Sequence, residues 1–214
     1  MSDRRPGSLG AEYALLAARD RRWVACGAVL GLALGGLGCA LAGWPLAGWA
    51  SGAGVVACAL SVLALAVYGA SSAWLTVTDL RAQRLPNPVV AWASAVVIGG
   101  LAVALLLLGE AERVVAAAGV AGLALLLFLA LWFRYPHSVG AGDVKLAPVT
   151  AFVAAIPGPQ SALVLYLGGI GLLGLIFAVT TLVRARSTFS FGPVLLLSSW
   201  LSFTLGPLFF AAPW

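Results

Sequence analysis

The sequence predicts an all-α fold, a polytopic membrane bundle of about seven transmembrane helices. The chain is 62% hydrophobic and only 9% charged, whereas a soluble globular domain carries about 25% charged residues. Its mean hydropathy is +1.06. The apolar residues fall into uncharged stretches, and a helix of about 20 such residues crosses the ~30 Å hydrocarbon core of a bilayer. We therefore expect an integral membrane protein.

Six uncharged stretches are long enough to span the membrane, and a seventh is short. The six are residues 23–43, 53–77, 89–108, 114–133, 161–183 and 191–210. The short one, 144–156, is lengthened at its amino end by residues 140–143, so it begins inside the membrane boundary. In the first stretch Gly27, Gly31 and Gly35 recur every four residues, a spacing that allows close helix packing. We expect them to pack inside the chain, with a dimer interface as the alternative.

Single residues predict local features of three helices. Asn87 can cap the helix that follows it, and Pro88 suits a first helical position. Pro148 predicts that its helix starts late, near Ala147, or is kinked there. Trp200 falls near a predicted boundary, where tryptophan is typical of the membrane interface.

The positive charges predict the orientation. With seven spans the two termini lie on opposite sides, and a cytoplasmic amino terminus places all but one of the 12 Lys and Arg residues in the cytoplasm. Only Arg113 lies outside, together with the carboxyl terminus. Without the short span, Arg184 and Arg186 would also move outside. The net charge of +5 thus reflects orientation and contact with membrane lipid, and we expect no nucleic-acid partner.

The chain divides into a basic cytoplasmic tail, residues 1–22, and one membrane-embedded domain, residues 23–214. No connecting segment in the second part is long enough to fold independently. Cys26, Cys39 and Cys58 lack the paired spacing of a zinc or redox site. We therefore expect no metal ion.

Two of the seven carboxylates, Asp79 and Asp143, stand apart from the others. The remaining five lie in the tail or in one polar break: Asp3, Glu12, Asp20, Glu110 and Glu112. The predicted topology places Asp79 and Asp143 together at the cytoplasmic boundary, where ionisable groups are costly and usually face a cavity or a partner. Gly140 and Gly142 precede Asp143 and leave room for an extended chain against the backbone.

Two carboxylates close together do not both ionise readily, so one holds a proton while the other is an anion. Such a pair can activate water and protonate a leaving amine. Asp143 is near a helix amino end with Lys145 nearby, so it is the expected anion, and Asp79, at a helix carboxyl end, is the expected proton carrier. The assignment can exchange within a coupled pair. The alternative is a non-enzymatic protein, such as a small ion- or proton-coupled transporter.

Three sequence strings resemble the prepilin peptidase family, the type IV leader peptidases among the GxGD intramembrane aspartyl proteases. They are TDLRAQRLPN at 78–87, GAGDVKL at 140–146 and Phe-Gly-Pro at 191–193. The resemblance covers roughly residues 71–205. It implies an aspartic endopeptidase of the bacterial plasma membrane that removes the basic leader of type IV pilin-like precursor proteins at the cytoplasmic face.

By the same resemblance Asp79 and Asp143 are the catalytic residues, Gly140 and Gly142 shape the motif, and Lys145 and Asn87 support it. Hydrolysis by such a pair needs no cofactor. Longer members carry a cytoplasmic insertion with paired Cys-x-x-Cys motifs and also methylate the new amino terminus. This chain has neither the insertion nor those cysteines, so we do not expect methyltransfer. The choice between pilin and pseudopilin substrates stays open, as does the oligomeric state.

Overall fold

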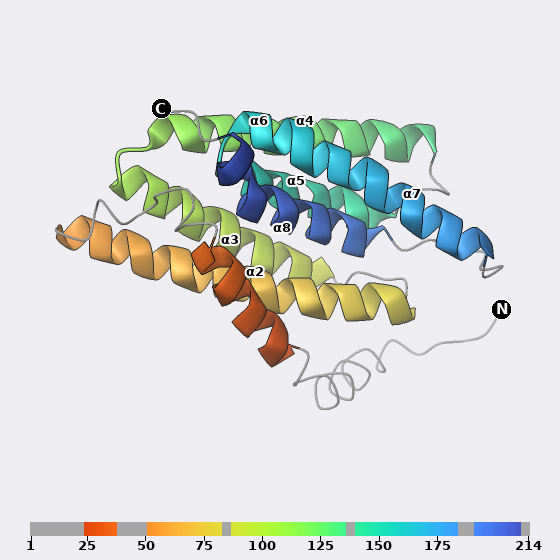
Figure 1. Ribbon diagram of the computed structural model, residues 1–214, viewed down its shortest axis with the longest axis horizontal. Helices are drawn as coiled ribbons and strands as arrows, with labels where there is room; N and C mark the ends of the chain where they lie inside the picture. Colours follow the sequence, from red (N-terminus) through yellow and green to blue (C-terminus); the bar gives the residue numbers. More distant parts are fainter. Residues whose placement is uncertain (1–23, 38–50, 83–86, 136–139, 184–190, 211–214) are drawn as a thin grey trace.

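The structure is a computed structural model that describes residues 24–37, 51–82, 87–135, 140–183 and 191–210. Helices make up all the regular structure in these segments, which confirms the all-α prediction (Figure 1). A helix at Val24–Leu37 comes first. The others are α2 (Gly52–Ala82), α3 (Asn87–Leu107), α4 (Ala111–Arg134), α5 (Ala141–Ala155), α6 (Pro159–Ser161), the π-helical turn η2 (Ala162–Tyr166), α7 (Leu167–Val183) and α8 (Gly192–Phe209). The predicted tail, residues 1–22, lies outside the described residues.

Five of the described helical segments are long and apolar enough to cross a membrane. They are Gly52–Leu80, Asn87–Leu107, Ala111–Arg134, Pro159–Thr180 and Gly192–Phe209. The chain is thus a polytopic membrane protein. Helix α5 has 15 residues, about 22 Å at 1.5 Å per residue, which is shorter than the hydrocarbon core. The predicted first span, 23–43, is described only for Val24–Leu37, so the count of seven and the orientation stay predictions.

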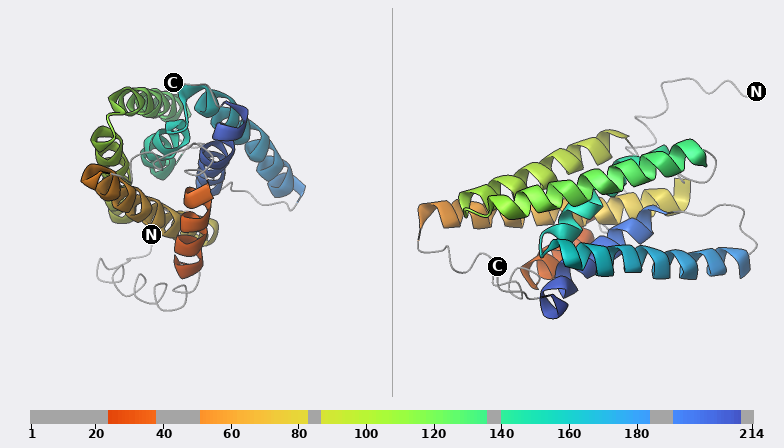
Figure 2. Two further views of the ribbon diagram at one scale, coloured as in Figure 1. Left: turned by 60° about the vertical axis from the view of Figure 1, so that its left-hand side comes forward. Right: turned by 90° about the horizontal axis from the view of Figure 1, so that it is seen from above.

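Successive long helices run in opposite directions, which gathers several helix ends on one side of the bundle. The carboxyl ends of α2, α4 and α7 lie at the same end, on the right in Figure 1. Helices α3, α5 and α8 begin toward this end, and the views in Figure 2 agree. This arrangement brings the end of α2 and the starts of α5 and α8 to one region of the molecule.

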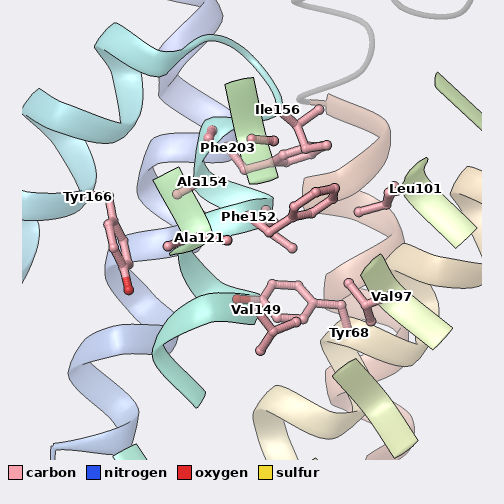
Figure 3. Close-up of a cluster of buried hydrophobic side chains, with 14 of the residues drawn as sticks. Tyr68, Val97, Leu101, Ala121, Val149, Phe152, Ala154, Ile156, Tyr166 and Phe203 are labelled. Carbon is pink, nitrogen blue, oxygen red and sulfur yellow. The ribbon is translucent and has the colours of Figure 1, made fainter. Parts of the chain in front are cut away.

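Helices α5 and α8 form the centre of the bundle. In α8, 72% of the apolar window is buried, against 12% to 39% in the other four spans. In α5 every residue from Val149 to Ala155 is buried. Figure 3 shows Phe152 of α5 and Phe203 of α8 within a buried cluster that includes Tyr68 and Val97. The two central helices are therefore held by extensive packing, and one face of α8, with Leu197, Leu201 and Leu208, is exposed.

The glycines of the first helix pack inside the chain, as expected. A Cβ atom added at Gly31 would lie 2.6 Å from the Gly69 Cα of α2, and one at Gly35 would lie 2.8 Å from the Leu65 Cδ1 atom. Gly27 likewise lies against Ala73 and Gly69. The first helix crosses α2 at these glycines, and the crossing is visible in Figure 1.

One alternative for Pro148 and the interface prediction for Trp200 were wrong. Helix α5 begins at Ala141 and runs through Pro148, so it does not start near Ala147, whereas the kink, the other alternative, stays a prediction. Although Pro148 cannot donate a backbone hydrogen bond to residue 144, the burial of α5 on all sides holds the helix together. Trp200 is 8% exposed and lies in the core, because its ring packs 5.1 Å from that of Tyr68 and its Nε1–H donates to Ser72 Oγ at 3.3 Å.

Candidate active site

Asp79 lies in the last turns of α2 and is 6% exposed. Its Oδ2 atom accepts a hydrogen bond from the backbone N–H of Gly192 at 3.0 Å. Gly192 is the first residue of α8, and the first N–H groups of a helix have no partner within it. The end of one transmembrane helix is thus joined to the start of another through the carboxylate.

Asp143 lies in the first turn of α5 and is half-buried. Its Oδ2 atom accepts from the backbone N–H of Gly140, the N-cap residue, at 3.3 Å. A Cβ atom at Gly140 would approach this oxygen to 3.1 Å, so glycine leaves the carboxylate its space. Gly142 lies between the two, in the same turn. The Asp143 side chain therefore caps the amino end of α5 by accepting from the backbone of Gly140.

The two carboxylates interact electrostatically. Asp143 lies outside the five membrane-spanning segments, and its pKa is raised from 3.8 to about 6, first by burial and then by the negative charge of Asp79. The Gly140 N–H acts in the opposite direction but is the smallest of the three effects. The sequence had favoured Asp143 as the anion. Burial and the charge of Asp79 act in the opposite direction and favour the protonated form of Asp143.

The two predicted supporting side chains contact each other. The Lys145 Nζ atom donates to the Asn87 Oδ1 atom at 3.0 Å, and both residues are exposed. This hydrogen bond ties α5, just after its first turn, to the start of α3, with Pro88 in the first turn of α3 as expected. Residues 83–86, which complete the first motif, lie outside the described residues.

The sequence predicts no role in the site for Gly192, which is only one residue of the Phe-Gly-Pro string. The structure places it against Asp79, from which it is 113 positions away in sequence. Such a contact depends on how α8 is placed against α2, and hydropathy carries no signal for that placement.

The described segments contain no group of three or more His, Cys, Asp or Glu side chains that could hold a metal ion. The site is instead a pair of carboxyl groups at one end of the bundle, and burial and the charge of Asp79 raise the pKa of Asp143 to about 6. A proton donor beside a second carboxylate is the arrangement that acid–base hydrolysis requires.

The sequence model of the type IV leader peptidase family matches residues 66–212, more than half of the chain. The chain belongs to the type IV leader peptidase family. The matched region of this leader peptidase contains Asp79, Asp143 and the start of α8, whereas the helix Val24–Leu37 lies outside it. Comparison with curated proteins and with solved structures gave no match. Family membership confirms the resemblance seen in the sequence and supports peptidase activity in general.

Proposed function

We propose that this protein is an aspartic endopeptidase that cleaves the leader of type IV pilin-like precursors at the cytoplasmic face of the bacterial plasma membrane. The observation that carries the proposal is that a buried Asp79 near the carboxyl end of α2 and a half-buried Asp143 in the first turn of α5 lie at the same end of the bundle. Both lie inside the region that matches the leader peptidase family. Gly140, Gly142, Lys145 and Asn87 support the pair. The proposal is limited to hydrolysis and includes no methyltransfer.

The chemistry follows from one protonated and one unprotonated carboxyl group. A water oxygen bonds to the scissile carbonyl carbon while Asp79 takes a proton from that water. Asp143 gives its proton to the carbonyl oxygen, which forms a neutral tetrahedral intermediate. When the C–N bond breaks, the leaving nitrogen takes a proton from Asp79 and the intermediate returns one to Asp143. Both carboxyl groups then regain their starting states.

The position of the pair supports cleavage near the membrane surface. Asp79 is close to the carboxyl end of α2 and Asp143 is in the first turn of α5, so a peptide bond just outside the hydrocarbon can reach them. A transporter would instead place its acids on broken helices near the middle of the membrane. The excess of Lys and Arg at this end favours its being cytoplasmic.

The test is coexpression with pilin-like precursors, followed by intact mass measurement of the precursor. We expect the wild-type protein to shorten the precursor by its leader, and Asp79→Asn and Asp143→Asn to leave it uncut while still inserting into the membrane. Glu112→Gln, in the first turn of α4 at the other end of the bundle, is the matched control and should cut normally. Leader removal by either Asn variant would exclude the proposed pair.

A further inference from the structure

The start of α8 presents one backbone amide to the site. The Gly192 N–H donates to Asp79 Oδ2 at 3.0 Å, and both residues are buried. Because this N–H belongs to the first turn, it has no acceptor within α8. The positive end of the helix dipole also favours a negative group at this place. The amide and the carboxylate therefore satisfy each other.

Residue 192 has no room for a side chain. A Cβ atom there would lie 2.6 Å from Asp79 Oδ2 and 3.3 Å from its Cγ, whereas real Cβ atoms keep at least 3.0 Å from other heavy atoms. The Asp79 side chain is short, so its carboxyl group could avoid the added atom only by moving away from the amide. Any side chain at residue 192 would thus displace Asp79.

Helix α8 is held by contacts at its start and further along, so its first turn does not follow such a displacement. The Phe191 ring packs 5.9 Å from that of Phe128 in α4. Further along α8, Trp200 donates to Ser72 of α2 at 3.3 Å. The register of α8 against α2 is therefore fixed by contacts away from the carboxylate.

We propose that Gly192 is a positioning residue of the aspartate pair. Its N–H fixes the Asp79 carboxylate, and its missing side chain leaves that carboxylate its space at the end of the bundle where α5 and Asp143 begin. The catalytic meaning of this placement rests on the proposed function, but the placement itself does not.

The first test compares Gly192→Ala with Gly171→Ala. Gly171 lies within α7 and has no atom within 4 Å of the added Cβ position, so it is a matched control. We expect kcat for precursor cleavage to fall by about 10-fold or more in Gly192→Ala, because a 1 Å misplacement costs about 100-fold, with KM within about twofold of wild type. Equal kcat values for the two variants would overturn the proposal.

The second test needs neither a substrate nor a folded Gly192 variant. Phe191-Gly192 is the only Phe-Gly pair in the sequence, so labelling Phe at its carbonyl carbon and Gly at its nitrogen gives one amide signal in a carbon-selected NMR spectrum. We expect this amide proton to move upfield in Asp79→Asn, where the acceptor is neutral, and to stay in place in Glu112→Gln. An unchanged signal in Asp79→Asn would refute the contact, whatever the result with pilin precursors.

Discussion

Replacing Asp79 by Asn tests the electrostatic effect of Asp79 on Asp143. The pKa of Asp143 is raised from 3.8 to about 6, a difference of about 3 kcal/mol between its two protonation states at 1.36 kcal/mol per pKa unit. Burial is the larger cause and the charge of Asp79 the second. Removing that charge should therefore lower the pKa, while burial, which outweighs the Gly140 hydrogen bond, should keep it above 3.8.

The assay is carboxyl-carbon NMR of the protein labelled at the Asp side chains, titrated in lipid nanodiscs. The sequence has four aspartates, Asp3, Asp20, Asp79 and Asp143, and Asp143→Asn assigns the relevant signal. We expect Asp143 to titrate near 6 in the wild type and in Glu112→Gln, and at a lower pH in Asp79→Asn. A wild-type value near 3.8, or an equal or higher value in Asp79→Asn, would refute the reasoning.

The raised pKa has a consequence for activity with a definite sign. Asp143 is protonated below about pH 6 and loses its proton as the pH rises through this value. If Asp143 is the acid of the reaction, the rate of cleavage should fall above about pH 6.

Two other contacts give further predictions. Gly31→Val should lower the free energy of unfolding by about 1 to 3 kcal/mol through overpacking against Gly69. Gly36→Val should have a smaller effect, because nothing lies within 4 Å of its added Cβ. Denaturant unfolding measures both variants, and equal losses of stability would contradict the packing of Gly31 against Gly69. Lys145→Met and Asn87→Ala should each slow cleavage, and the double variant should be no slower than the worse single one, because the residues share one hydrogen bond. Additive losses in kcat/KM would show that they act separately.

Composition was sufficient to predict the helical class and most of the spans. The five long helices fall where uncharged stretches occur in the sequence, because a membrane requires every backbone polar group to be bonded within its own helix. Asp79 and Asp143 could be chosen in the same way. Acids are rare in this chain, and the alternation of helices puts these two at one end.

What the sequence could not predict depends on which way the helices face. Trp200 looked like an interface residue, but α8 is turned so that its ring lies in the core against Tyr68. The rise in the pKa of Asp143 could not be predicted for a related reason, since its largest cause, burial, is a property of the assembled bundle. Gly192 was part of a visible motif, yet its partner became evident only from the placement of α8 on α2.

The most direct test of the account is cleavage of a purified pilin-like precursor by the purified protein in lipid nanodiscs, with intact masses of both products. The account predicts that the wild-type protein and Glu112→Gln break one peptide bond at the leader boundary. Asp79→Asn and Asp143→Asn should each lose at least about 100-fold in rate, since the general acid–base step alone contributes about 100- to 10,000-fold. Cleavage by either Asn variant within about tenfold of the wild-type rate would contradict the account, because the two carboxyl groups would then not carry the reaction.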